Sequence, residues 1–314
     1  MCVIDKILFD YKKIRIQPND TLTTLYLPAV KKLNLIMDEA DSPQATATCI
    51  ILSSYSLQKW AEKSRNEIEI FEKRNEGLGT VEEIHNLLVE IYDVPRKMNL
   101  PEHSKSLVLT KEILDLVETS IDEVRRFPNG GDKMYEIMER IHLNPNFEEH
   151  PITRNDLTRW YKRAVELIIS RFGDKFSKTF EEIIMKLAER DEEKQIAYHN
   201  TFLLLEAYPI FKWSSSVQID IDNLKTAEAN SIARQLFVVK LVDEAIERIK
   251  DYPDEGHICA NIIEAIITDK KADDVCSEHN VSRSFYYRAR KKAILLLSYL
   301  IWGYTTRDIL NLAI

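Results

Sequence analysis

The sequence contains little glycine, with 7 residues among 314. Nucleotide-binding loops of the Rossmann and P-loop types need clustered glycines, because only glycine lets the backbone approach a phosphate closely. The close pairs, Gly77 with Gly79 and Gly130 with Gly131, stand between helical stretches, where a turn is the better interpretation. The sequence indicates no nucleotide site, and we expect no cofactor.

Catalytic and metal-binding signatures are also missing. The 7 histidines show no HExxH or HxH spacing, and the 4 cysteines form no CxxC pair. Asp220 and Asp222 could share a metal ion as in a nuclease, but they follow a serine run without a supporting histidine, so a solvated loop is favoured. No GxSxG or Cys/His signature is present. We therefore expect no catalytic residue, no metal ligand and no enzyme.

Long apolar runs are lacking as well. The most apolar run, 293–302, is shorter than the roughly 20 residues that cross a bilayer. The N-terminus shows no apolar segment followed by a small-residue cleavage site. Cys49, Cys259 and Cys276 lie in apolar helical contexts, which favours buried, reduced thiols. These features predict a soluble, cytoplasmic protein without a membrane partner.

Helical periodicity dominates a chain that is 45% hydrophobic and 30% charged. Prolines and short polar clusters separate the amphipathic stretches, and the run 214–216 with 219–222 is the clearest linker. Residues 6–16 alternate enough for a short strand. The remaining pattern predicts an all-α protein with helices at about 22–38, 43–74, 80–92, 104–126, 132–142, 154–171, 175–208, 225–252, 257–268 and 271–302.

An internal repeat is the most informative feature. When the chain is shifted by 125 residues, 113–164 falls on 238–289 without a gap. Unrelated sequences would share about three identities over this length. The identical pairs are Leu116/Leu241, Val117/Val242, Ile121/Ile246, Pro128/Pro253, Gly131/Gly256, Ile137/Ile262, Glu139/Glu264, Ile141/Ile266, Asn155/Asn280, Tyr161/Tyr286, Arg163/Arg288 and Ala164/Ala289.

Upstream, 203–208 resembles 87–92, and 186–190 resembles 59–63, in the same order. Chance similarity of amphipathic helices is the alternative, but shared Pro, Gly and Arg-Ala positions favour tandem duplication. We expect two domains, 1–172 with a degenerate first repeat and 173–314 with the second repeat.

The second repeat ends in a predicted helix-turn-helix at 271–302. Cys276 can be the small residue where the two helices cross, and Asn280 tolerates the positive φ of the turn. Val281 would fill the angle between the helices, and Ser282 would cap the second helix. Its inward positions would be Tyr286, Ala289, Ala293, Leu296 and Leu297.

The outward face of this second helix is basic. Segment 282–292 holds five basic residues and no acidic one, although the whole chain has a net charge of -8. Lys and Arg can contact phosphates, and Arg can reach guanine edges. A solvated basic face is the alternative, but the turn and cap favour DNA binding. The predicted DNA-binding residues are Ser282, Arg283, Ser284, Tyr287, Arg288, Lys291 and Lys292.

The first repeat keeps Arg159, Lys162 and Arg163 at the corresponding place. Its first helix contains Pro151, which disfavours a helical residue before it, and acidic residues lie nearby. We interpret this copy as a degenerate module for packing, dimerisation or partner binding rather than for reading bases.

Residues 174–303 resemble the ArpU family of phage-type transcriptional regulators, which are similar to the promoter-reading C-terminal domain of sigma factors. The resemblance is carried by 200–208, 242–253 and 281–293. It implies sequence-specific DNA binding and control of late or mobile-element genes. Family members usually hold one module, whereas two are predicted here, and 258–269 lacks the Arg-rich run expected there.

The sequence therefore predicts a DNA-binding transcriptional regulator whose partner is double-stranded DNA, with RNA polymerase or another regulator and a homodimer as further partners. Two alternatives stay open. One is a phage packaging protein of the small-terminase kind, which a ring-shaped oligomer would favour. The other is a helical protein-interaction module, which an absence of DNA affinity at low salt would favour.

Overall fold

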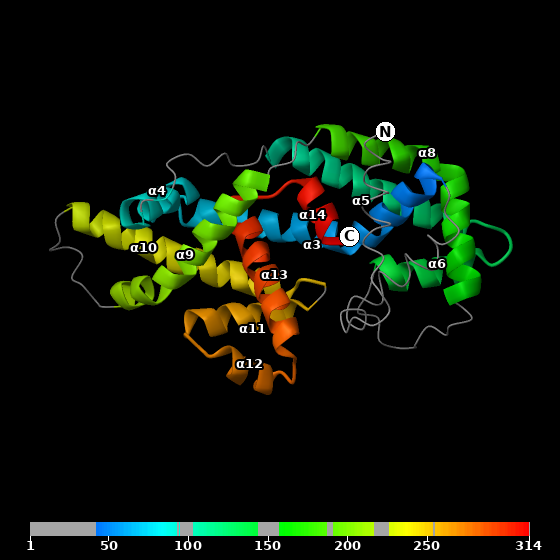
Figure 1. Cartoon of the computed structure of the whole chain (residues 1–314). Coiled ribbons are helices and arrows are strands. Elements are labelled where there is room, and N and C mark those ends of the chain that lie inside the picture. Colours follow the sequence, from blue (N-terminus) through cyan, green and yellow to red (C-terminus); the bar gives the residue numbers. More distant parts are fainter. Residues whose placement is uncertain are drawn as a thin grey trace. The chain divides into compact units, whose positions relative to one another are not determined.

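All regular elements in the part of the chain that the structure describes are helices, which confirms the all-α class (Figure 1). The structure, a computed structural model, describes residues 42–92, 94, 103–143, 157–186, 191–216, 226–253 and 255–313. The predicted strand 6–16, the predicted helix 22–38, and Asp220 with Asp222 lie outside these residues.

The α-helices are α3 (Pro43–Arg74), α4 (Val81–Tyr92), α5 (His103–Arg125), α6 (Gly131–Met138), α8 (Lys162–Lys186), α9 (Asp191–Ser216), α10 (Thr226–Lys250), α11 (Gly256–Ile267), α12 (Ala272–Glu278), α13 (Arg283–Trp302) and α14 (Thr306–Ala313). Two π-helical turns, η2 (Glu139–Leu143) and η3 (Leu157–Tyr161), adjoin α6 and α8.

The helix ends differ from expectation mainly in α8 and α9. Helix α9 continues through Pro209 to Ser216, so the serine run is its last turn and not a linker. The Ser215 hydroxyl donates to the Lys212 carbonyl at 3.1 Å, and the Ser216 hydroxyl donates to the Trp213 carbonyl at 2.8 Å. These bonds satisfy the serine hydroxyls within the helix, so a serine run can form its last turn although composition favours a loop.

The chain divides into two compact units that are discontinuous in sequence. Unit 1 consists of 1–61, 102–188 and 305–314, and unit 2 consists of 62–101 and 189–304. The division falls within α3, unlike the continuous boundary expected after residue 172. Consequently α8 belongs to unit 1, and the C-terminal helix α14 belongs to unit 1 as well.

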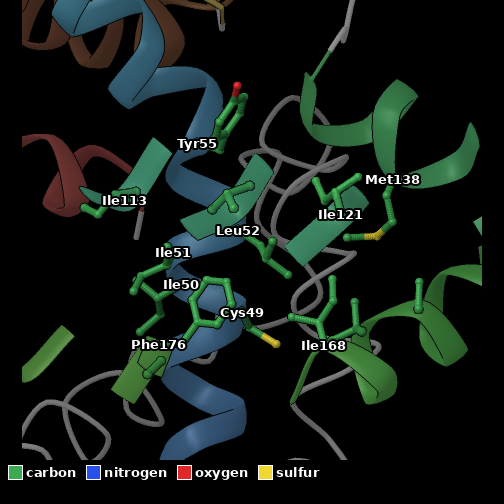
Figure 2. Close-up of a cluster of buried hydrophobic side chains, with 14 of the residues drawn as sticks. Cys49, Ile50, Ile51, Leu52, Tyr55, Ile113, Ile121, Met138, Ile168 and Phe176 are labelled. Atoms are coloured by element: carbon green, nitrogen blue, oxygen red, sulfur yellow. The ribbon is translucent and has the colours of Figure 1, made fainter. Parts of the chain in front are cut away.

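The core of unit 1 is built around the first part of α3. Figure 2 shows Cys49 and Leu52 of α3 among Ile121, Met138 and Ile168 from α5, α6 and α8, and all five side chains are buried. Burial raises the pKa of the Cys49 thiol to about 12, as expected for an unreactive core cysteine. Among the three described cysteines, Cys49 and Cys259 are buried and Cys276 is half-buried.

The core of unit 2 is formed by α9, α10, α11 and α13, which pack on one another. Most of α13 after residue 292 is buried, including Trp302. The Trp302 indole N–H donates to the Thr201 hydroxyl of α9 at 2.9 Å. This packing fixes the C-terminal half of α13 and leaves its N-terminal half beside α12.

Each unit contains a buried tyrosine that donates to a carboxylate on the next long helix. In unit 1, Tyr55 of α3 donates to Glu118 of α5 at 2.5 Å, and in unit 2, Tyr208 of α9 donates to Asp243 of α10 at 2.5 Å. The two carboxylates are 125 residues apart, in the register of the sequence repeat. By this bond Tyr208 of α9 resembles Tyr55 of α3, whereas the sequence comparison pairs 203–208 with 87–92 of α4.

The α5–α6 and α10–α11 turns are alike in detail. A Cβ added to Gly131 would come within 2.4 Å of the Arg125 carbonyl oxygen, and one added to Gly256 within 2.4 Å of the Ile249 carbonyl oxygen. The preceding residues, Gly130 and Glu255, both have positive φ, at 88° and 64°. Only glycine fits at such a close backbone approach. The tandem duplication itself stays a prediction.

Candidate nucleic-acid interface

Helices α12 and α13 are joined by a short turn with the local chemistry that the sequence predicts. Asn280 has a φ of 51°, in the left-handed region that asparagine tolerates. The Val281 amide donates to the Cys276 carbonyl at 3.0 Å, which closes the end of α12. Ser282 is the N-cap of α13, and its hydroxyl accepts from the Phe285 amide at 3.2 Å. The turn is therefore specified locally by Asn280 and Ser282.

The packing of the two helices matches the prediction on α13 and differs on α12. The predicted inward residues Tyr286, Ala289, Ala293, Leu296 and Leu297 are all buried. On α12, however, the buried residue is Val275, whereas Cys276 and Val281 are only half-buried. The small thiol and the valine of the turn therefore lie at the edge of the contact. Asn280 and Ser282 therefore define where α12 ends and α13 begins, but they do not determine which side of α12 packs against α13.

Most of the predicted DNA-binding residues lie on the open face of α13. Ser282, Arg283, Ser284, Tyr287 and Lys291 are exposed, and Arg288 is half-exposed. Tyr287 keeps 56% of its surface exposed, and its ring contacts the buried Tyr286 edge to face at 5.3 Å. Tyr287 thus places an exposed ring and hydroxyl next to Arg288 on the same side of the helix.

Lys292 is the exception among these residues. Its side chain is 10% exposed, and its Nζ lies 3.9 Å from a Glu255 carboxylate oxygen and 4.8 Å from the centre of the Tyr252 ring. Arg290 is also turned away from the open face, since its guanidinium lies 5.6 Å from the centre of the Phe202 ring. The open basic face of α13 is therefore formed by Arg283, Arg288 and Lys291.

Two ion pairs connect this region to acidic groups of α12. The Arg283 guanidinium donates to both carboxylate oxygens of Asp273, at 2.6 Å and 2.5 Å. This hydrogen bonding raises the pKa of Arg283 and lowers the pKa of Asp273. The Nζ atom of Lys270, just before α12, lies 2.5 Å from a carboxylate oxygen of Glu278. Because Arg283 is engaged by Asp273, it supplies less uncompensated charge than its exposure suggests.

Arg288 and Lys291 carry the uncompensated positive charge of the face. Within the described residues, neither side chain takes part in an ion pair of the structure. They lie three residues apart on α13, so both project from one side of the helix. We name Ser284, Tyr287, Arg288 and Lys291 the outer face of α13.

Other kinds of site find little support in the described part of the chain. No group of three His, Cys, Asp or Glu side chains there is arranged to hold a metal ion. An open cavity of about 530 Å³ in unit 2 is lined by Tyr208, Lys212, Lys240 and Asp243 among others, and its mixed charges favour no single class of ligand. Burial and the hydrogen bond to Asp243 raise the pKa of Tyr208, so this hydroxyl remains protonated. None of the described helices has the length and apolar character needed to cross a membrane.

No protein-family model, no curated protein and no solved structure matches the chain.

Proposed function

We propose that this protein binds double-stranded DNA through the outer face of α13 and regulates transcription, as a regulator of the phage or mobile-element type. The observation that carries the proposal is the combination of a Ser282-capped helix after a left-handed Asn280 with an open face bearing Arg288 and Lys291. A short helix, a tight turn and a second helix with an exposed basic face form the arrangement that enters the major groove.

The residues of the outer face differ in the DNA groups that they can contact. Arg288 has a planar guanidinium that can contact the two acceptors of a guanine, whereas Lys291 offers a point charge to a phosphate. Ser284 and Tyr287 supply hydroxyl groups for bases or phosphates. The N-terminus of α13 at Ser282 adds backbone N–H groups that favour a phosphate.

Charge distribution supports a localised contact. The chain carries a net charge of -8, yet residues 282–292 contain no acidic residue. An acidic body repels DNA elsewhere and thereby favours docking through the basic helix. The ion pair with Asp273 holds Arg283 beside α12, so Arg283 contributes less to the DNA contact than Arg288.

We also propose that the two units are copies of one ancestral module of the ArpU type. The paired bonds Tyr55–Glu118 and Tyr208–Asp243, with the matching Gly131 and Gly256 turns, support this duplication. On this proposal the polymerase, another regulator or a second copy of the chain would be the protein partner of a regulator bound at a promoter.

The test is fluorescence anisotropy with labelled duplexes that tile the DNA around the protein's own gene, titrated at two salt concentrations. Wild-type protein should bind one duplex in preference to a scrambled duplex of equal composition. The variant Arg288→Ala/Lys291→Ala should lose that preference and bind at least about tenfold more weakly. The matched control Lys73→Ala/Lys240→Ala removes the same charge from exposed positions of α3 and α10 and should bind like wild type.

Absence of binding at low salt by the folded wild-type protein would overturn the proposal. Equal losses in both double variants would indicate attraction by general charge and not by α13.

A second function, as a helical protein-interaction module, is favoured by one observation. Ile210 and Trp213 lie three residues apart on α9 and are 64% and 70% exposed. Their counterparts in unit 1, Leu57 and Trp60, are buried, so the exposed pair is peculiar to unit 2. Replacement of Trp213 by Ala should leave DNA binding unchanged but weaken a protein partner's binding, measured by calorimetry with purified RNA polymerase.

A further inference from the structure

A second basic surface lies in unit 1, around the turn between α5 and α6. Lys133, Arg159 and Arg163 are exposed there, and each lies over an aromatic ring. Lys133 Nζ and the Arg159 guanidinium are 5.7 Å and 4.9 Å from the centre of the Trp160 ring. The Arg163 guanidinium is 5.5 Å from the centre of the Phe127 ring. We name these five residues the cation–aromatic patch.

The Trp160 ring of the patch is in close contact with the backbone. Gly130 adopts a φ of 88°, and a Cβ added there would come within 2.2 Å of the Trp160 ring. The indole therefore lies directly against the α5–α6 turn. Cations that stack on such a ring lose less conformational entropy on meeting an anion, because their side chains are already positioned.

The three cations of the patch remain available for an external anion. Within the described residues, the structure pairs none of them with a carboxylate. The nearest acidic groups of the turn are engaged elsewhere, since Asp132 lies 3.7 Å from Arg125 and Glu123 pairs with Arg126. Exposed Glu166 on α8 is the one acidic side chain close in sequence to Arg163 that the structure leaves without a described ion pair. The patch is therefore net positive.

The place of the patch corresponds to that of the outer face in unit 2. In the 125-residue register, Arg163 corresponds to Arg288 and Trp160 to Phe285. Phe285 is buried under α13, whereas Trp160 is only half-buried and carries two cations. In this register Arg163 and Arg288 are the shared basic residues, whereas Arg159 corresponds to Ser284 and Glu166 to Lys291.

We propose that the cation–aromatic patch binds the sugar–phosphate backbone of duplex DNA, so that the chain contacts DNA through both units. This rests on the proposed function of α13. Its cations come from two elements, α6 and the η3–α8 helix, so they form a broad positive surface and not one row that follows base edges. Such a surface adds affinity and salt dependence without sequence preference.

The experiment uses the full chain and compares Lys133→Ala/Arg159→Ala/Arg163→Ala with wild type on the preferred and scrambled duplexes. Each phosphate contact adds about 0.9 to the magnitude of the slope of log K against log salt. The variant should therefore bind both duplexes more weakly, lower that slope by about two to three, and keep the wild-type ratio between the duplexes. The variant Arg159→Lys/Arg163→Lys, which keeps the charges, should retain the wild-type slope.

The matched control is Lys111→Ala/Lys175→Ala/Lys178→Ala, which removes three exposed charges from α5 and α8 away from the patch. An unchanged slope in the patch variant, or an equal change in the control, would overturn the inference and leave the role of α13 standing. A wild-type protein that binds neither duplex would overturn both. Circular dichroism melting of each variant shows whether a loss of binding comes from unfolding.

Discussion

The guanidinium of Arg283, the first residue of α13, donates two hydrogen bonds to the carboxylate of Asp273 in the first turn of α12. Two parallel bonds fix the angle between a short helix and the helix proposed to contact DNA. Both side chains are exposed, so water screens the pair, and its contribution to global stability is small. The pair therefore matters for the orientation of α13 and for the local charge.

Replacing Asp273 with Asn removes a negative charge beside the outer face and releases Arg283. DNA affinity of the variant should rise about threefold to tenfold at low salt and converge on the wild-type value at high salt, since the change is electrostatic. Anisotropy titration measures it. Asp274→Asn is the matched control, because Asp274 is an exposed neighbour on α12 without a described ion pair. Weaker binding by Asp273→Asn would show that the ion pair affects DNA binding more through the orientation of α13 than through the local charge.

The same ion pair predicts a pH dependence. The hydrogen bond from Arg283 lowers the pKa of Asp273 below its ordinary value of 3.8. A lowered pKa means that the pair is complete above pH 3.8 and is lost only as pH falls through the lower folded value. In an NMR titration followed at its carboxyl carbon, the Asp273 carboxylate should therefore protonate below pH 3.8. A midpoint at or above pH 3.8 would show that the pair is not formed in solution.

The two glycines at the helix turns should be equally intolerant of a side chain. Because a Cβ at Gly131 or Gly256 would come within 2.4 Å of a carbonyl oxygen, replacement by Ala should destabilise each by about 1–3 kcal/mol. Gly77→Ala is the control, as a Cβ there meets no atom within 4 Å. Urea unfolding of the three variants gives the comparison. An unaffected Gly131→Ala or Gly256→Ala variant would mean that the backbone approach is looser than described.

The tyrosine–carboxylate bonds should be of equal importance in the two units. Tyr55→Phe and Tyr208→Phe each remove a hydroxyl that donates to a carboxylate, and the free energy of unfolding should fall by about 1.5–3 kcal/mol in each. Tyr287→Phe, at an exposed ring, is the control and should leave stability unchanged. A loss confined to one unit would weaken the case that the units are copies.

Local features of the site could be predicted from the sequence, and features that depend on distant residues could not. Asn280 and Ser282 act through their own backbone and the next turn, so residue type alone indicated their conformations. The burial of Ala289 and Leu296 follows from helical period. Lys292, by contrast, was assigned to the DNA face from its place in a basic run, whereas Glu255 and Tyr252 of the preceding turn attract it.

The internal repeat shows a similar limit. Its gapless segment was detectable because Pro, Gly and Arg-Ala positions recur at one spacing. Tyr55 and Tyr208 are 153 residues apart, a spacing outside the 125-residue register, so the sequence comparison does not pair them. The hydrogen bond that each tyrosine donates to a carboxylate relates the two residues, and that bond is visible only in three dimensions.

The most direct test of the central claim asks whether the outer face of α13 touches DNA. A photoreactive p-benzoylphenylalanine is introduced in place of Tyr287, and, as a control, in place of Trp213 on α9, which is exposed to a similar degree. Under saturating binding and irradiation, position 287 should form a covalent protein–DNA adduct, and position 213 should form little or none. Adducts from position 213 without any from position 287 would contradict that claim.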